Sequence, residues 1–154
     1  MDGSSARPEA YVLDPVRQQW TEIAGLFPLG RAESIDVRGR YNPGGRWGHM
    51  AVASPDGRVF VFGGFAAVAW GAGYDSLWTR VIQYDPATRT WTYAGDLGSG
   101  RIEHSATLLP DGTILIIGGL ANPDVTLTDK TRIDGAVFRY IPAPRQHAAS
   151  SPVR

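Results

Sequence analysis

The 154-residue sequence contains no cysteine, no long apolar run and no excess of charge of either sign. Without cysteine the chain forms no disulfide, no thiolate metal site and no thiol nucleophile. No apolar run approaches the roughly 18 residues that a membrane-spanning helix needs. Fifteen basic residues balance fifteen acidic ones, so the charge indicates neither a nucleic-acid partner nor an anionic membrane surface.

The first eight residues also lack the apolar stretch of a signal peptide. This absence and the lack of cysteine favour a cytoplasmic protein. A secreted origin, with a signal peptide already removed, stays open as the alternative.

What the sequence does contain is a repeat. Residues 46–64 and 101–119 share Arg, His, Pro-Asp-Gly and Gly-Gly at one offset (101 − 46, 104 − 49 and 119 − 64 each give 55). Self-similarity at a fixed period of this length indicates a repeat architecture. The nineteen glycines and eleven prolines are typical of many turns and therefore of many short strands.

Each repeat predicts up to four antiparallel strands. In the first copy they cover residues 50–53, 59–62, 80–84 and 90–93, and a Pro-Asp-Gly turn joins the first two. The runs at 59–62 and 114–117 are continuously apolar, which predicts strands buried on both faces. The second copy predicts strands at 106–109, 114–117 and 136–140. A partial copy at the N-terminus predicts two more, at 10–13 and 20–23.

The repeat resembles the kelch motif, in which a Gly-Gly doublet precedes a Tyr and a Trp at fixed spacing. Gly63-Gly64, Tyr84 and Trp91 fit this pattern, and the second copy has Gly118-Gly119 and Tyr140 without the Trp. The sequence of residues 101–112 also resembles kelch units of galactose-oxidase-like proteins. The resemblance implies an all-β fold, a β-propeller in which each repeat is one four-stranded blade.

The expected organisation follows from these boundaries. Residues 1–9 are a flexible N-terminus, 10–23 the last two strands of one blade and 24–45 a link. Residues 46–94 are a complete blade, 95–140 a blade without its fourth strand and 141–154 a flexible tail. A closed propeller needs about 4–8 blades, so a little over two predicts a fragment of a larger propeller or self-association that completes one.

Two repeat-matched pairs are candidate site residues. In kelch proteins an Arg at the start of a blade often points into the mouth of the propeller, so Arg46 and Arg101 are candidates for binding a carboxylate or phosphate of a partner. The alternative is that they bond backbone carbonyls between blades. His49 and His104 form a weak metal signal, because no carboxylate or thiolate stands at ligand spacing. We expect each His to tie its strand to the neighbouring blade.

The segment 65–74 breaks the repeat and is unusually apolar. Its aromatic residues Phe65, Trp70 and Tyr74 are candidates for recognising a peptide or a sugar ring. The equally weighted alternative is that the loop folds back and buries Trp70 itself.

We therefore expect a non-catalytic kelch-repeat module that binds a protein or peptide partner, with no cofactor, no metal, no nucleic acid and no membrane. The alternative is a fragment of a galactose-oxidase-like copper radical oxidase or of another kelch-fold enzyme. The oxidase resemblance implies Tyr and His copper ligands and a Cys cross-linked to a Tyr. Because this chain has no Cys, it does not assemble that cofactor alone.

Overall fold

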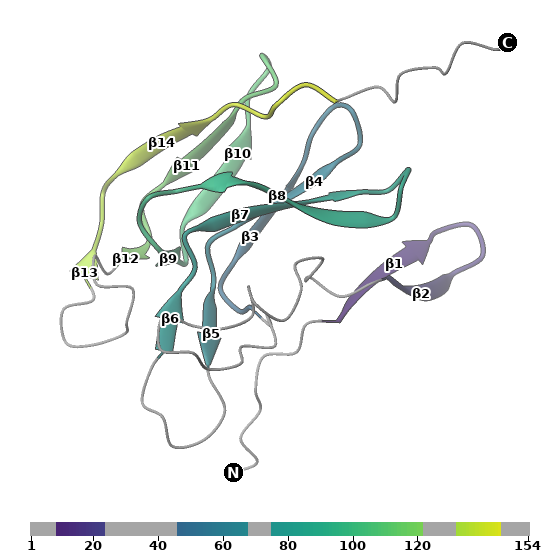
Figure 1. Cartoon of the computed structure of the whole chain (residues 1–154), viewed down its shortest axis with the longest axis horizontal. Coiled ribbons are helices and arrows are strands. Elements are labelled where there is room, and N and C mark those ends of the chain that lie inside the picture. Colours follow the sequence, from purple (N-terminus) through teal and green to yellow (C-terminus); the bar gives the residue numbers. More distant parts are fainter. Residues whose placement is uncertain (1–8, 24–45, 68–74, 122–131, 146–154) are drawn as a thin grey trace, which may run out of the picture.

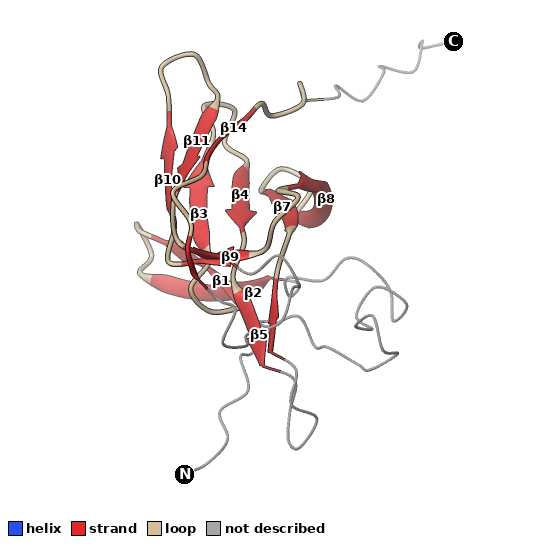
Figure 2. Ribbon diagram, turned by 90° about the vertical axis from the view of Figure 1, so that its left-hand side faces the viewer, coloured by secondary structure: helices blue, strands red, loops and turns tan. Residues whose placement is uncertain are grey.

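The computed structural model describes residues 9–23, 46–67, 75–121 and 132–145. The described residues form strands and turns, and none of them belongs to a helix that could cross a membrane (Figures 1 and 2). The strands are β1 (Ala10–Asp14), β2 (Gln19–Ile23), β3 (Met50–Ala53), β4 (Val59–Phe62), β5 (Phe65–Ala67), β6 (Asp75–Leu77), β7 (Arg80–Asp85), β8 (Thr90–Asp96), β9 (Arg101–Ile102), β10 (Ser105–Leu108), β11 (Ile114–Ile117), β12 (Leu120–Ala121), β13 (Arg132–Ile133) and β14 (Val137–Tyr140).

The middle blade is the antiparallel sheet β3-β4-β7-β8. Its first turn forms because Gly57 takes a φ of 85° and donates its N–H to the Ser54 carbonyl oxygen. Asp56 accepts hydrogen bonds from the Ser54 hydroxyl and the Arg58 guanidinium. The Arg58 hydrogen bond holds the pKa of the Asp56 carboxyl far below its usual value. The four strands expected from the sequence are present, and β8 extends to Asp96.

The third blade is the antiparallel sheet β10-β11-β14. Its strands correspond to β3, β4 and β7 of the middle blade, and no described residue supplies a fourth strand. The expectation that β11 is buried on both faces is wrong. Ile114 and Ile116 are buried, whereas Ile117 is 43% exposed, because no described blade covers that face.

The N-terminal hairpin of β1 and β2 lies beside the middle blade (Figure 1). Asp14 closes its turn by accepting the N–H groups of Val16 and Arg17, both at 2.9 Å. These bonds and the Arg17 guanidinium hold the pKa of Asp14 below its usual range. The hairpin packs Ala10 and Ile23 against a buried cluster of the middle blade, namely Val61, Ile82, Tyr84 and Trp91.

The main core lies between the middle and third blades. From the middle blade it takes Val52, Phe60, Phe62, Val81 and Leu97, and from the third blade Ile114 and Ile116. Tyr140 closes this core, because its ring contacts Phe60 and Phe62 at centroid distances of 5.5 and 5.3 Å. Its hydroxyl donates to the Ala94 carbonyl oxygen at 2.7 Å, so one side chain supplies both packing and a polar link between blades.

Two segments differ from the sequence-based expectation. The segment after each Gly-Gly was expected to be a loop. Instead it starts with one short strand and ends with another, and the two strands pair, β5 with β6 and β12 with β13. The first residues of the expected flexible tail are held in place. Arg58 donates to the Ala143 carbonyl oxygen at 2.8 Å, and Arg145 pairs with Asp85. Residues 1–8, 24–45 and 146–154 lie outside the described part.

Candidate functional site

Three of the site residues expected from the sequence, Arg46, Phe65 and Arg101, are described by the structure and lie at one end of the blades, which we call the hairpin end. It comprises β5, β6, β9, β12 and β13. In Figure 1 β5 and β6 lie below β3 and β7, and β9, β12 and β13 lie below β10 and β11. The chain turns into this end at Gly63-Gly64, where φ is 58° and 102°. Trp47 and Phe65 then exchange two backbone hydrogen bonds, of 3.0 and 2.9 Å.

The third blade repeats this arrangement. Its glycines 118 and 119 also have positive φ, and Leu120 pairs with Ile102 on one side and Ile133 on the other. The three-stranded sheet β13-β12-β9 therefore matches the Trp47–Phe65–Leu77 pairing of the middle blade. Both blades therefore have the same backbone arrangement at the hairpin end, but different side chains.

Arg46 is buried within the middle blade. Its Nη1 donates to the carbonyl oxygens of Gly63, at 3.2 Å, and Arg80, at 3.0 Å. Its guanidinium lies 4.5 Å from the centroid of the Trp78 ring, a cation–π geometry. Burial, and secondarily the positive charge of Arg80, lowers the pKa of Arg46 to about 9, so the side chain keeps its charge at neutral pH.

Arg101 repeats one hydrogen bond of Arg46 and otherwise contacts different groups. Its Nη1 donates to the Gly118 carbonyl oxygen at 2.8 Å, the repeat equivalent of the Arg46–Gly63 bond. Its Nη2 donates to Asp134 at 3.2 Å, and its guanidinium stacks 4.4 Å from the Phe138 ring centroid. The side chain is fully buried, as a salt-bridged, hydrogen-bonded scaffold residue would be.

Both arginines bond backbone carbonyls, as the alternative considered for them has it, but these carbonyls belong to the arginine's own blade and not to a neighbouring one. Arg46 is 6% exposed and Arg101 is 0% exposed. Each guanidinium reaches a partner only if the packing around it opens. Direct partner contact by these two residues stays a prediction.

The two repeat-matched histidines lie where the middle and third blades meet. His104 is buried, and neither of its ring nitrogens has a hydrogen-bond partner among the described residues. Burial lowers its pKa to about 4, and the charges of Arg101 and His49 contribute. Burial also lowers the pKa of His49. His104 is therefore neutral at physiological pH, and the described residues contain no group of three potential metal ligands.

Phe65 is buried in a small cluster with Leu77 and Ile102 at the base of the hairpins. Trp70 and Tyr74, the other aromatic residues expected to bind a partner, lie outside the described residues. Phe65 instead supports a residue that sequence reasoning missed. Trp47 is half-exposed and contacts Phe65 edge-on, with 4.8 Å between ring centroids.

Two further residues of the hairpin end were also missed. Ile133 is largely exposed, and Asp134 forms the salt bridge to Arg101. A signal for Trp47 was present in the sequence, because Trp47 and Ile102 occupy the same repeat position and differ. No comparable signal existed for Asp134, whose partner is 33 residues away.

Comparison with known proteins agrees with this architecture. A family model described as Kelch motif matches residues 46–98. The chain is 33% identical over 119 residues to the Kelch-like protein terF of Aspergillus terreus (strain NIH 2624 / FGSC A1156), a match covering 65% of this chain and 24% of that protein. The solved structure of YjhT, a kelch propeller, superposes with a TM-score of 0.54 at 20% identity, covering 75% of this chain and 28% of that one. The chain spans about a quarter of the length of each relative.

Proposed function

The chain belongs to the kelch-repeat family, and from this premise we propose that it is a non-catalytic module whose hairpin end binds a protein or peptide partner. The observation that carries the proposal is Trp47. Its indole is half-exposed while its ring edge rests on the buried Phe65. Exposed aromatic side chains with a rigid support are frequent anchors of protein interfaces.

The rest of the hairpin end supports the same role. Ile133 is largely exposed on β13, so an apolar residue is presented by each of the two blades. The two arginines shared by the repeats bond backbone carbonyls, so the residues that differ between the blades are the ones proposed to distinguish one partner from another. Differences between blades at a common end are what a binding surface built on a repeat scaffold requires.

The proposal extends to the aromatic segment between β5 and β6. Trp70 and Tyr74 belong to that segment in the sequence, and we include them as partner contacts. The net charge of zero favours a protein or peptide over a polyanion such as nucleic acid, because polyanion binding rests on clustered positive charge. The chain is proposed to take part in binding as part of a larger propeller, which either further blades or further copies of the chain would complete.

A peptide library displayed on phage and selected on the immobilised full chain tests the proposal. We expect selected peptides to lose at least tenfold in affinity for Trp47→Ala and for Ile133→Asp. Tyr93→Ala is the matched control, because Tyr93 is a half-exposed aromatic in the middle of β8, away from the hairpin end. Peptides that bind all three variants as tightly as the original chain would place the binding surface elsewhere.

A further inference from the structure

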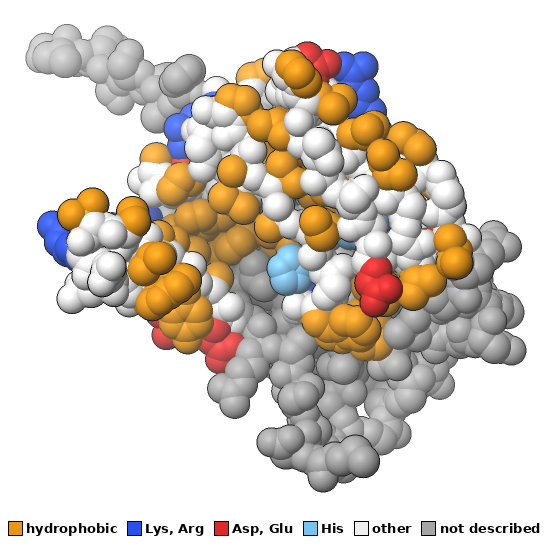
Figure 3. All heavy atoms as spheres, turned by 180° about the vertical axis from the view of Figure 1, so that it is seen from behind, with side chains coloured by type: hydrophobic (Ala, Val, Ile, Leu, Met, Phe, Trp, Pro, Cys, Tyr) orange, Lys and Arg blue, Asp and Glu red, His pale blue; other side chains and the backbone are white. Residues whose placement is uncertain are grey.

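The row of blades exposes an apolar face on each of its outer sides. The apolar residues of the forward face, on the third blade, are Leu115, Ile117 and Val137, and their cross-strand partners Ser105, Thr107 and Arg139 share the face. The apolar residues of the rear face, on the N-terminal hairpin, are Tyr11, Leu13 and Trp20, with Glu22 paired to Tyr11. Hydrophobic side chains gather on the hairpin and on the body beside it in the space-filling view (Figure 3). Monomeric proteins rarely expose apolar patches of this kind, and such a patch normally marks a surface that another molecule covers.

The repeat identifies what covers the forward face. Ile117 corresponds to Phe62 (117 − 62 = 55) and Val137 to Val81 (137 − 81 = 56). Phe62 and Val81 are 0% exposed, whereas Ile117 and Val137 are 43% and 62% exposed. In the middle blade these positions pack against the third blade, on Ile114, Ile116, Phe138 and Tyr140. The forward face is therefore the side on which another kelch blade packs.

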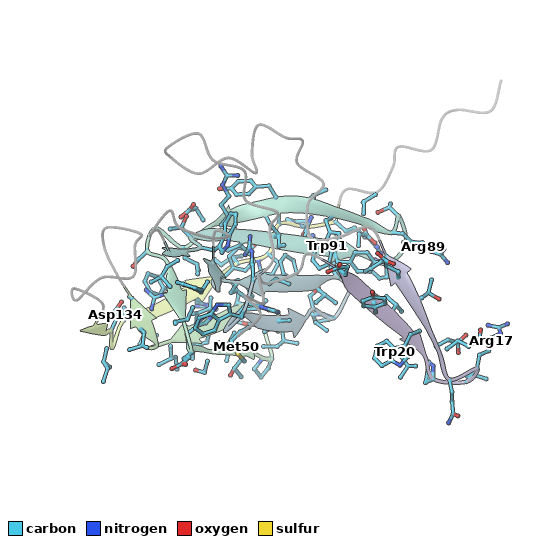
Figure 4. All side chains as sticks on the ribbon, turned by 90° about the horizontal axis from the view of Figure 1, so that it is seen from below. Arg17, Trp20, Met50, Arg89, Trp91 and Asp134 are labelled. Atoms are coloured by element: carbon cyan, nitrogen blue, oxygen red, sulfur yellow. The ribbon has the colours of Figure 1, made fainter. Side chains whose placement is uncertain are left out.

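The rear face is matched in the same way. Leu13 and Trp20 correspond to Tyr84 and Trp91 (84 − 13 and 91 − 20 both give 71). Tyr84 and Trp91 are 5% and 6% exposed beneath the hairpin, whereas Leu13 and Trp20 are 42% and 67% exposed. Figure 4 shows Trp20 on the hairpin, apart from Trp91 on the middle blade.

Strand alternation gives the direction of the rear face. Val12, Thr21 and Ile23 line a pocket of about 630 Å³ between the hairpin and the middle blade, opposite Tyr84. Successive side chains point to opposite sides of a strand, so Tyr11, Leu13 and Trp20 point away from the middle blade. The rear face is the side on which a preceding blade packs.

A glycine marks the forward side independently. A Cβ on Gly63 would lie 2.4 Å from the Arg101 carbonyl oxygen of the next blade. Gly118, its repeat equivalent, has the same left-handed backbone, with φ of 68° against 58°. The nearest described atom to a Cβ there is the Asp134 carbonyl oxygen at 3.5 Å. The forward side thus has the form of a blade junction with its next blade missing.

We propose that the forward face of one copy of this chain packs on the rear face of a second copy, head to tail. The junction continues between chains the blade-to-blade packing that already holds the middle and third blades together. Because two different faces meet, the interface is heterologous and yields a ring or an open row of copies. This association uses the outer sides of the blades and is independent of the partner proposed for the hairpin end.

Sedimentation velocity over about 1–100 μM tests the association, and two charged variants test its geometry. The forward variant carries Ile117→Arg and Val137→Arg, and the rear variant carries Leu13→Arg and Trp20→Arg. We expect the original chain to grow in mass with concentration and each variant alone to remain monomeric. Val16→Arg, at the largely exposed tip of the hairpin turn, is the control and should associate like the original chain.

Mixing the two variants is the decisive measurement. Each retains one intact face, so head-to-tail packing predicts a 1:1 dimer that grows no further. Because all four substituted residues are exposed, the variants should keep the melting temperature that the original chain has when it is dilute enough to be monomeric. An original chain that stays monomeric throughout the range overturns the proposal. A variant that still associates alone overturns it as well, because like faces would then be pairing.

Discussion

Gly63 lies directly against the carbonyl oxygen of Arg101, on the neighbouring blade. A Cβ added to Gly63 would approach that oxygen to 2.4 Å and the His104 ring to 2.8 Å. The same carbonyl accepts the N–H of Gly64 at 2.8 Å. The glycine doublet of the repeat is thus a point where the two blades touch through their backbones, and its left-handed φ values are a second reason for glycine.

The two equivalent glycines predict a measurable asymmetry. Alanine at either position adopts a left-handed backbone, which costs about 1–2 kcal/mol. Only Gly63→Ala also forces the blades apart, adding about 1–3 kcal/mol for overpacking. We expect urea unfolding to show a clearly larger loss for Gly63→Ala than for Gly118→Ala. Equal losses would mean that the two blades do not meet at Gly63.

Arg101→Ala tests whether the repeat arginines are scaffold. The substitution removes the bond to Gly118 and leaves the Asp134 carboxylate without its buried partner. Asp134 is partly exposed, so water can solvate its carboxylate once Arg101 is gone. The loss then comes mainly from the hydrogen bonds of a charged group, which contribute about 1.5–3 kcal/mol, and we expect a loss in that range by chemical denaturation.

Arg17→Ala is the control for the loss of an arginine. Arg17 is exposed and pairs with Asp14 across a surface turn, where ion pairs contribute little. Its removal should hardly move the unfolding midpoint. If Arg101→Ala were tolerated as well as Arg17→Ala, the buried contacts of Arg101 would not hold the third blade.

Stability should fall in mild acid because of His104. Burial lowers its folded pKa to about 4, against about 6.5 in an unfolded chain. Between these values the unfolded state takes up a proton that the folded state refuses, so stability is full above pH 6.5 and declines toward pH 4. From pH 7 to 5 we expect a loss of about 1–2 kcal/mol from this residue.

Denaturation of the original chain and of His104→Gln across that pH range measures the effect. The variant should lose less stability on acidification, whatever its stability at pH 7. His49, whose pKa burial also lowers, leaves a residual slope in the variant. If the stability of the two proteins fell equally with pH, the pKa of His104 would be the same in the folded and unfolded states.

The turns and strands within each blade could be predicted from the sequence, because they depend on residues close together in the chain. Pro-Asp-Gly sets the first turn of each blade through the φ of its glycine, and the runs at 59–62 and 114–117 are strands as expected. The short strands after each Gly-Gly were missed. Two-residue strands such as β12 and β13 carry no periodic signal. They form by pairing, β12 with β9 on one side and with β13 on the other.

By itself, the sequence determined the repeat, the strands within each blade and the kelch identity, because spacing and turn chemistry act between near neighbours. Only the tertiary structure decided that Arg101 is buried on Asp134, that Trp47 rather than Phe65 faces solvent, and that Ile117 is open where Phe62 is closed. Each of these depends on which surface lies opposite. Burial is a property of two surfaces in contact, and one repeat sequence gives different burial where a neighbour is present and where it is absent.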